Sequence, residues 1–462
     1  MSMRFDGRHI HFVGMGGVGM SAVAHMAIDC GARVSGCDAK DSPALRLLAE
    51  RGCRIHLGHD PAHLDGVAMV VRSSAIAPAS PEIQEALRRC IPVVTRARML
   101  ARFTADCSLI TVAGAHGKTT TTWIASKLLL EAHLDPSVMV GGMVRELGGN
   151  YRLGGSPFFV TEVDESDGSL LEFTPRYSIV TNVDHEHVDR YPDLAAVQET
   201  FRRFLARTRR DGCAIVCADS APALETLDAC PAPVLTYGFD SAAQFQAINV
   251  HANGESSTFD VRRPRDVLRG LTLTLPGLHN VQNALACVAL ASALGIPDEA
   301  LHNAFGRVAS VGRRMERKGA ARGVTMIDDY GHHPAEIRAT LGAARGLAHG
   351  RLLGVFQPHR YTRTYHLSER FGDCFDGLDY LVLLPIYSAG EPPLEGVSTQ
   401  AIESAIRRHG RVACSCFNDW DSARRHLIGL LRPGDTLLTI GAGDVDHFGE
   451  QVLDDLRKRE TR

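Results

Sequence analysis

The sequence predicts an α/β protein built from three domains. Three features carry this prediction: the chain has 462 residues, buried-type strands alternate with helical patterns along most of its length, and glycine-rich or acidic loops follow several strands. Domains of about 150 residues are common, so about three are expected here. Strands that alternate with helices are typical of parallel sheets with helices on their faces. We place the domains at residues 1–105, 106–311 and 312–462. The first and last are expected to be Rossmann-like, and the central one to be a phosphate-loop ATPase type with a β-meander.

The bulk composition is that of an ordinary globular protein, with 45% hydrophobic and 22% charged residues. A formal net charge of -3 gives no electrostatic reason to expect a nucleic acid or a membrane surface as a partner. No apolar run approaches the ~18 residues of a membrane-spanning helix, and the first residues lead into a strand without the apolar core of a signal peptide. The twelve cysteines form no C-x-x-C pair, which favours a reducing cytoplasm and a role as small buried hydrophobes.

The first domain carries a glycine-rich turn between a strand at residues 9–14 and a helix that runs to about residue 29. A second strand ends at Asp38, about 20 residues after the turn, as in the G-x-G-x-x-G motif of dinucleotide-binding folds. Such glycines let the backbone approach a diphosphate, so any diphosphate-bearing ligand fits them, NAD included. A tight turn without a ligand is the competing interpretation. A later strand ends at Ser73 and Ser74, at the edge where ligands collect in open α/β sheets.

The central domain opens with a phosphate-binding loop. Residues 108–112 are typical of a buried strand, residues 113–117 of a small-residue turn, and Lys118 begins an apolar-periodic helix. Backbone N–H groups and the dipole at a helix N-terminus attract an anion. The lysine adds charge near β- and γ-phosphates, and Thr119 offers a hydroxyl to Mg²⁺. The match to G-x-x-x-x-G-K-[ST] lacks its first glycine, because Val112 stands there. We therefore predict a nucleoside triphosphate site, against the alternative of a turn with a solvated lysine.

Two further strands of this domain end in acids and imidazoles. The strand at residues 158–162 runs into an acid-rich segment that begins with Glu162, and the strand from residue 177 opens into a run of acids and histidines. Carboxylate oxygens suit Mg²⁺, and an imidazole can complete a second, less strict metal site. Acids after strands also serve as helix N-caps, which is the competing interpretation. The second run comprises Asp184, His185, Glu186, His187 and Asp189.

Residues 245–275 alternate as a β-meander does, and a long apolar helix follows them. Asn280 and Asn283 fall in the first turn of this helix, where an amide can read the edge of a base. His279 and Asn280 are alternatively helix caps.

The third domain begins with a basic connector around residues 312–319 and repeats the pattern of strand and polar loop. The first strand, in TMIDDYGHHPAEI, ends in two acids, an aromatic residue and two histidines, and the second, in LLGVFQPHRYTRT, ends in Arg360 and Arg363. The segments YLVLLPIYSAGEPP and TLLTIGAGDVD repeat this scheme, and helices are expected from residues 334, 366, 398 and 419. Arg360 and Arg363 are three residues apart, so both can fork onto one carboxylate, unless they are a pair of surface arginines.

Taken together, the motifs resemble those of the Mur ligases along almost the whole chain. They are AGAHGKTTTT, TEVDESDGS, TNVDHEHVD, LHNVQNAL, GRRME, DDYGHHPAE and FQPHRYTRT. The resemblance implies a UDP-binding domain, a central ATPase domain and an amino-acid domain, which join a carboxylate to an amine at the expense of ATP. The forms GMGGVGMS, EVDESDGS and HRYTR are most similar to the member that joins L-alanine to UDP-N-acetylmuramate for cytoplasmic peptidoglycan precursors. That member lacks the carbamoylated lysine of its relatives, which fits the absence of lysine between Lys127 and Lys318. Two features depart from the family pattern: Val163 replaces the usual alanine, and the last strand leads into GAGDVDHFG.

The resemblance also implies roles for single residues. Those expected to be catalytic are Lys118, Glu162, His187, His332 and Arg314. Two Mg²⁺ ions, or Mn²⁺ in their place, would bind Thr119, Glu162 and His187. The UDP moiety would meet Gly14, Gly16, Gly17, Gly19, Asp38, Ser73 and Ser74. ATP would meet Gly114, His116, Gly117, Lys118, Thr119, Thr120, His279, Asn280, Asn283 and, on domain closure, Arg314 and Asp329. The amino acid would meet Tyr330, His332, Arg360 and Arg363, with His332 either a proton acceptor or a pocket wall.

Three other functions stay open at this point. A Mur ligase that recycles a murein tripeptide shares the UDP-N-acetylmuramate substrate. A NAD-dependent oxidoreductase would explain the first glycine turn but not the central phosphate loop. A nucleotide switch would hydrolyse ATP without ligation. We expect a monomer or a weak homodimer.

Overall fold

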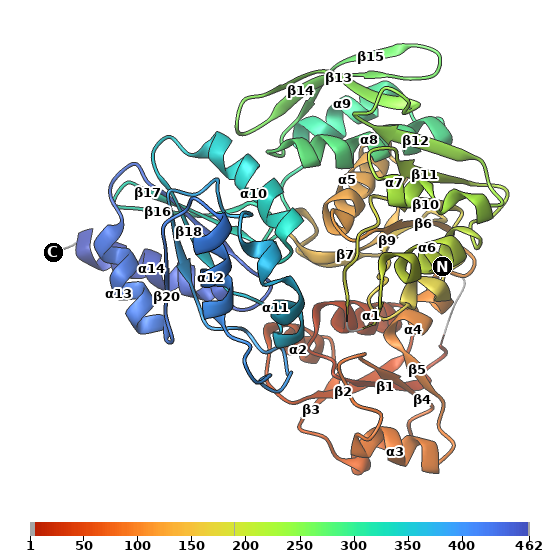
Figure 1. Ribbon diagram of the computed structural model, residues 1–462. Helices are drawn as coiled ribbons and strands as arrows, with labels where there is room; N and C mark the ends of the chain where they lie inside the picture. Colours follow the sequence, from red (N-terminus) through yellow and green to blue (C-terminus); the bar gives the residue numbers. More distant parts are fainter. Residues whose placement is uncertain (1–4, 189, 461–462) are drawn as a thin grey trace. The chain divides into compact units, whose positions relative to one another are not determined.

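Figure 1 shows the computed structural model, which describes residues 5–188 and 190–460. Asp189 therefore lies outside the described residues. The strands form three sheets, and the packing divides the chain into two compact units. Unit 1 comprises Met1–Asp184, Ala195–Thr236 and Ser292–Leu294, and unit 2 comprises His185–Leu194, Tyr237–Ala291 and Gly295–Arg462. Within the described ranges, no helix is both long enough and apolar enough to cross a membrane.

The first sheet belongs to unit 1 and consists of five parallel strands in the order β3-β2-β1-β4-β5. Because β1 lies between β2 and β4, the loops after β1 and β4 meet at the switch point where ligands bind in such sheets. This topology confirms the predicted Rossmann-like fold. The elements are β1 (His9–Val13), α1 (Val18–Asp29), β2 (Arg33–Asp38), α2 (Pro43–Glu50), β3 (Arg54–Leu57), η1 (Pro61–Leu64), β4 (Met69–Arg72), α3 (Pro81–Arg88), β5 (Val93–Thr95) and α4 (Arg96–Thr104).

The phosphate-loop part of the central sheet also belongs to unit 1. Five parallel strands run in the order β11-β10-β6-β9-β7, and β8 pairs antiparallel with β7. Strand β6 therefore has β9 and β10 as neighbours, and the loops after all three open at one edge. The elements are β6 (Ser108–Ala113), α5 (Lys118–Glu131), β7 (Ser137–Val144), η2 (Arg145–Leu147), β8 (Gly149–Arg152), β9 (Phe158–Glu162), η3 (Ser169–Glu172), β10 (Tyr177–Val180), α6 (Leu194–Leu205), β11 (Cys213–Cys217), α7 (Ala221–Leu224), η4 (Leu227–Ala229) and β12 (Val234–Gly238).

The last strands of the ten-stranded central sheet, β13 to β15, belong to unit 2. Tyr237 and Gly238 pair with β13, and β13, β14 and β15 form the antiparallel meander that the alternation predicted. Helix α9 packs against β15. The elements are β13 (Phe245–Ala252), β14 (Ser257–Arg262), β15 (Val267–Leu273), α8 (Leu278–Leu294) and α9 (Asp298–Arg307).

The third sheet lies in unit 2 and has the order β16-β17-β21-β18-β19-β20, parallel except for the β16–β17 hairpin. Apolar clusters cover its two faces, one around Phe356 and Phe375 and the other around Phe448 and Val452. The elements are β16 (Glu316–Ala321), β17 (Val324–Asp329), α10 (Pro334–Leu347), β18 (Leu352–Phe356), α11 (Tyr361–Leu367), η5 (Glu369–Phe371), β19 (Tyr380–Leu383), α12 (Thr399–His409), β20 (Cys414–Cys416), α13 (Trp420–Leu430), β21 (Thr436–Ile440) and α14 (Val445–Glu460).

Two expectations for this domain were wrong in detail. Part of the basic segment 312–319 is not a connector, because Glu316–Ala321 pairs with β17 as a strand. The helix expected from residue 366 begins at Tyr361 instead, because Arg360 (φ 73°) turns the chain and its carbonyl accepts the N–H of Thr364 at 3.1 Å. The helices predicted from residues 334, 398 and 419 are confirmed to within a residue.

Candidate active site

The glycine turn after β1 is held by the end of β2. The N–H of Gly16 donates to Asp38 Oδ2 at 2.8 Å, and the N–H groups of Gly14 and Met15 donate to the carbonyl of Cys37. A Cβ on Gly16 would lie 3.0 Å from Asp38 Oδ2, so glycine lets the turn close over this carboxylate. Asp38 therefore shapes the turn from inside, and its predicted contact with UDP stays a prediction.

The other predicted UDP-binding residues surround the same turn. A Cβ on Gly14 would lie 3.0 Å from Ser73 Cβ, so the loop after β4 lies against the turn, and Ser74 next to it is exposed. Gly17 has open space around it, and a Cβ on Gly19 would lie 3.2 Å from the guanidinium of Arg96. Arg96 was missed by the sequence reasoning, because no motif links the start of α4 to a turn far away in sequence.

The phosphate loop has the geometry of an anion site. Gly114 (φ 139°) and Gly117 (φ 81°) adopt conformations that L side chains rarely adopt, and no side chain caps the start of α5. The amino group of Lys118 donates to the carbonyl of Gly114 and lies 3.1 Å from Glu165 Oε2. Glu165 is 2% exposed, so the Lys118 ammonium is held by a buried carboxylate that the sequence reasoning did not single out.

The end of β10 fixes the middle of the phosphate loop. Asn182 Oδ1 accepts the N–H of His116 at 2.9 Å, and Thr181 Oγ1 donates to the carbonyl of His116 at 2.6 Å. His116 Nε2 lies 3.6 Å from Asp184 Oδ2. Thr181 and Asn182 were not predicted, although they sit in the motif TNVD beside the acids that were. Thr120 lies half-buried in the first turn of α5.

The two predicted magnesium ligands of unit 1 are in direct contact. Thr119 Oγ1 donates to Glu162 Oε2 at 2.7 Å, across the β6–β9 pair. An alcohol and a carboxylate oxygen at this spacing fit the oxygen-only preference of Mg²⁺. Gly141 on β7 leaves room for Glu162, since a Cβ there would lie 1.5 Å from Glu162 Oε1. Gly141 is a further residue that the sequence reasoning missed.

In unit 2, His187 lines a narrow cavity together with the predicted arginines. The loop holds His187 in a left-handed conformation (φ 52°), and Glu186 beside it is 7% exposed. The cavity is lined by His185, Glu186, His187, Val188, His333, Arg360, Thr362, Arg363 and Leu367. The predicted metal-binding histidine and the predicted amino-acid arginines thus share one pocket.

The two arginines are held differently within this pocket. Arg360 forms an ion pair with Glu391, which also accepts the N–H of Thr362 at 3.0 Å. Arg363 donates to Nδ1 of His359 at 3.1 Å and to its carbonyl at 3.2 Å. Burial lowers the pKa of Arg363, and the charge of Glu186 opposes that shift. Arg363 is therefore the better placed of the two to receive a carboxylate, while Glu391 occupies Arg360.

Tyr330, His332 and Arg314 form an adjoining cluster. The Arg314 guanidinium lies 5.2 Å from the centre of the Tyr330 ring and 3.7 Å from Glu336. His332 Nδ1 lies 3.2 Å from the carbonyl of Tyr330, and its backbone N–H donates to Glu336. Burial lowers the pKa of His332 well below its ordinary value, so its imidazole is neutral near neutral pH.

Asp329 is engaged inside the protein. Its carboxylate accepts the N–H groups of Gly331 (2.8 Å) and Met315 (2.9 Å) and the hydroxyl of Thr340 (2.9 Å), and it is 4% exposed. These bonds fasten the segment before β16 to the end of β17. Contact of Asp329 with ATP stays a prediction.

Of the three residues expected near adenine, His279 and Asn280 lie in the first turn of α8, whereas Asn283 lies in the second turn, because the helix begins at Leu278. Asn280 Nδ2 donates to the carbonyl of Pro276 at 2.7 Å, and Asn283 Nδ2 donates to Asn280 Oδ1 at 3.2 Å. Burial lowers the pKa of His279, and nearby Asp329 opposes this effect. The structure thus brings His279 near Asp329 in unit 2, and both amides hold the start of the helix.

This fold, with a lysine- and threonine-bearing phosphate loop and an arginine-lined pocket, defines a three-domain α/β enzyme that acts on a nucleoside triphosphate. Family models for the Mur ligase family catalytic domain, the Mur ligase middle domain and the Mur ligase glutamate ligase domain match residues 9–107, 112–291 and 313–443. The chain belongs to the Mur ligase family.

Relatives and solved structures agree with this assignment. The chain is 43% identical to UDP-N-acetylmuramate–L-alanine ligase of Geobacter sp. (strain M21), over 96% of each chain. It is 40% identical to the enzyme of the same name from Geotalea uraniireducens, over 97% of this chain and 98% of that one. The structure of UDP-N-acetylmuramate–alanine ligase MurC from Thermotoga maritima matches with a TM-score of 0.80 and 26% identity, over 98% of this chain and 100% of that chain.

Proposed function

We propose that this enzyme joins L-alanine to the carboxylate of UDP-N-acetylmuramate, with ATP converted to ADP and phosphate. The observation that carries the proposal is the phosphate loop, where Lys118 and Thr119 face Glu165 and Glu162 at hydrogen-bonding distance. The substrate names come from relatives that are 40–43% identical over almost the whole chain. Cytoplasmic peptidoglycan precursor synthesis is the corresponding process.

The first step brings two anions together. A muramate carboxylate oxygen attacks the γ-phosphorus, the bond to the ADP oxygen breaks, and an acyl phosphate forms. Two unit charges 4 Å apart repel by ~1 kcal/mol in water and by ~4 kcal/mol at an effective dielectric of 20. Lys118, at the N-terminus of α5, would offset this repulsion and stabilise charge on the transferred phosphoryl group.

Thr119 and Glu162 would hold one Mg²⁺ and His187 a second divalent ion, Mg²⁺ or Mn²⁺. Bound there, these ions supply further neutralisation of the phosphate charge. The oxygen donors of Thr119 and Glu162 fit such an ion.

The second step forms the amide. The α-amine of alanine attacks the acyl carbon, the tetrahedral intermediate collapses, and inorganic phosphate leaves. Arg363 would hold the alanine carboxylate and turn the amine toward the acyl carbon, an orientation effect worth several kcal/mol. The neutral imidazole of His332 would take up the proton of the amine or form the pocket wall. Its lowered pKa makes it a weak base, which favours the wall.

Phosphate release tests the proposed function directly. Purified protein with ATP, Mg²⁺ and UDP-N-acetylmuramate should release phosphate on addition of L-alanine, with a matching amount of UDP-N-acetylmuramoyl-alanine by mass spectrometry. Preference for the murein tripeptide would assign the recycling reaction instead. Phosphate release without any amine would indicate a nucleotide hydrolase. The ligase assignment would be wrong if ADP formed under all conditions without a new C–N bond. A change in NADH fluorescence on titration would support the oxidoreductase.

Lys118→Ala is expected to abolish ADP formation and to leave the affinity for UDP-N-acetylmuramate within about twofold, because the glycine turn after β1 is a separate site. Lys127→Ala is the matched control, since Lys127 lies on the same helix and pairs with Glu131 and Glu146. The role given to Lys118 would be contradicted if Lys118→Ala and Lys127→Ala lost ADP formation equally, or if Lys118→Ala also lost its affinity for UDP-N-acetylmuramate.

A further inference from the structure

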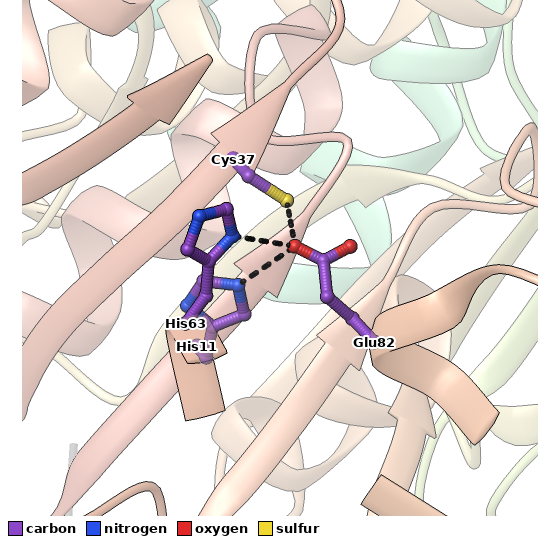
Figure 2. Close-up of side chains that lie close together, drawn as sticks. All are labelled: His11, Cys37, His63 and Glu82. Carbon is purple, nitrogen blue, oxygen red and sulfur yellow. Dashed lines mark hydrogen bonds and ion pairs between the residues drawn. The ribbon is translucent and has the colours of Figure 1, made fainter. Parts of the chain in front are cut away.

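Four side chains of kinds that bind transition metals converge inside the N-terminal sheet. His11 lies on β1, Cys37 on β2, His63 in η1 and Glu82 in the first turn of α3 (Figure 2). Each offers one ligand atom, and these four atoms lie within 4.8 Å of one another. None of the four belongs to the residues assigned to ATP, UDP, metal or amino acid above.

The distances between the ligand atoms are close to those around a tetrahedrally coordinated ion. Glu82 Oε1 lies 2.8 Å from His63 Nδ1, 3.0 Å from Cys37 Sγ and 3.8 Å from His11 Nε2. Zn²⁺ bound at its usual distances of about 2.3 Å to sulfur and about 2.0 Å to nitrogen and oxygen separates its ligand atoms by roughly 3–4 Å. Shifts of about 1 Å or less would therefore complete the coordination sphere.

The orientation of His11 is that of a metal ligand. Its Nδ1 lies 2.8 Å from Ser35 Oγ, which also contacts His9 Nε2 at 2.7 Å. The other nitrogen, Nε2, is directed at Glu82 and is buried without a hydrogen-bond partner. Histidines that bind metals commonly use one nitrogen for the ion and fix the ring through the other. Here the fixing contact is present, and the nitrogen left for an ion is the unpartnered one.

The cluster also concentrates ionisable groups where water does not reach. The side chains of His11 and Glu82 are 0% exposed, Cys37 is 0% exposed, and the side chain of His63 is 12% exposed. The apolar side chains packed around Cys37 include Val13, Leu64, Val70 and Ile83. Burial raises the pKa of the Cys37 thiol, and contact with Glu82 raises it further. Without a cation the thiol therefore stays protonated and donates to Glu82. A divalent cation would stabilise the thiolate and balance its charge beside the carboxylate in this apolar site.

We propose that His11, Cys37, His63 and Glu82 bind one structural Zn²⁺ ion in the N-terminal domain. One thiolate, two imidazoles and one carboxylate form a donor set that selects Zn²⁺ over the Mg²⁺ of the phosphate loop, because Mg²⁺ prefers oxygen. Binding deprotonates the Cys37 thiol and releases that proton to solvent.

The ion would join parts of the domain that hold the glycine turn. Its ligands come from two strands and two helical segments, so it would pin η1 and α3 to the sheet. Cys37 is also the residue whose carbonyl accepts the N–H groups of Gly14 and Met15. The side chains of Cys37 and Asp38 point to opposite faces of β2, so the ion and the UDP site lie on different sides of the same strand end.

A network without metal is the competing interpretation. Glu82 can accept hydrogen bonds from Cys37, from His63 and, at 2.7 Å, from His59 Nδ1. This network satisfies the carboxylate, but it leaves His11 Nε2 without a partner.

Metal analysis of the full-length protein separates the two interpretations. Protein purified without chelator and dialysed against excess Mg²⁺ should retain about one equivalent of zinc per chain by mass spectrometry. Cys37→Ser should lose it. Cys53→Ser should keep it, because Cys53 is also buried in this domain (8% exposed) but lies outside the cluster. Removal of zinc should lower the Tm of unmodified protein by several degrees.

Cobalt substitution provides a second test on the unmodified protein. Stripped protein titrated with Co²⁺ should develop the near-ultraviolet charge-transfer band of a cobalt–thiolate bond, saturating at one equivalent. If Cys37→Ser fails to fold, His63→Gln, a change at the least buried ligand, should keep the thiolate but require a higher Co²⁺ concentration to reach the same band. The proposal is overturned if unmodified protein retains no zinc and shows no thiolate band, or if zinc is retained equally by Cys37→Ser and Cys53→Ser.

Discussion

Lys118 and Thr119 each contact a different carboxylate, and a bound ligand would change the two contacts in different ways. Lys118 pairs with Glu165, so a triphosphate must compete with Glu165 for the ammonium group. Thr119 donates to Glu162, and an ion placed between these oxygens would replace one hydrogen bond with two coordination bonds. We infer that Glu165 positions Lys118, whereas Glu162 serves the metal.

Gly141→Ala is expected to move Glu162 and to leave the fold intact. The new Cβ would stand 1.5 Å from Glu162 Oε1, which is the far end of a flexible side chain, so the carboxylate can turn away from Thr119. Loss of an oriented metal ligand should raise the Mg²⁺ concentration needed for half-maximal phosphate release by on the order of tenfold or more. The measurement is the Mg²⁺ concentration at half-maximal rate.

Gly149→Ala on the neighbouring strand β8 is the control for this prediction. A Cβ at Gly149 meets nothing within 4 Å, so its Mg²⁺ dependence should match that of the unmodified enzyme. If the two alanine variants need the same Mg²⁺ concentration for half-maximal rate, the position of Glu162 does not matter for metal binding, and Glu162 is not a metal ligand.

His359 should make the stability of the folded protein sensitive to acid. Burial, together with the charges of Arg363 and Arg360, lowers the pKa of His359 to about 4. The folded protein therefore binds fewer protons than the unfolded chain between about pH 6.5 and 4. Stability supplied by neutral His359 is fully present above that range and is lost as the pH falls through it. The loss should amount to about 1–3 kcal/mol after solvent screening is allowed for.

His359→Asn should flatten this part of the pH dependence, because asparagine can still accept from Arg363 and does not titrate. The measurement is the free energy of unfolding by urea at several pH values. His302→Asn on α9 alters an exposed histidine and serves as the control. If the free energy of unfolding of His359→Asn depends on pH as steeply as that of the unmodified protein, other groups cause the acid sensitivity.

At the scale of elements, Arg313 fastens the start of the segment GAGDVDHFG after β21. Its guanidinium donates to the carbonyls of Gly441 and Gly443 at 2.7 Å each and pairs with Asp328 at 3.2 Å. A Cβ on Gly443 would lie 2.3 Å from Gln357 Oε1, so glycine lets the segment pass close to β18. The loop after β21 is thus held to the segment before β16 and to β18.

Arg313→Ala should destabilise the C-terminal domain by roughly 3 kcal/mol, because it leaves buried Asp328 without its cation. Burial already raises the pKa of Asp328 to about 6, and Arg313 opposes that shift. Arg317→Ala, at an exposed position of β16, should change stability by no more than about 0.5 kcal/mol. Urea unfolding of both variants provides the comparison, and equal stabilities would contradict the role given to Arg313.

The elements themselves were largely predictable from local pattern. Buried strands followed by glycine or acid predicted the two Rossmann-like sheets and the phosphate loop, and alternation of apolar and polar residues predicted the meander, because each of these patterns is local in the sequence. Strand β16 was missed because Glu316–Ala321 carries charge and glycine, and pairing with β17 outweighs its weak propensity. The early start of α11 depends on the left-handed turn at Arg360, which no propensity for arginine predicts.

At the scale of the whole molecule, the motifs supplied residues but not the contacts between them. Glu165 and Asn182 lie inside the motifs TEVDESDGS and TNVDHEHVD, yet only the strand order brings them to Lys118 and His116. Gly141 lies outside every motif and contacts Glu162 from a neighbouring strand. The zinc cluster is the extreme case, since positions 11, 37, 63 and 82 have no metal-binding spacing. Resemblance to a family supplied the reaction, whereas the packing supplied the partners of each predicted residue.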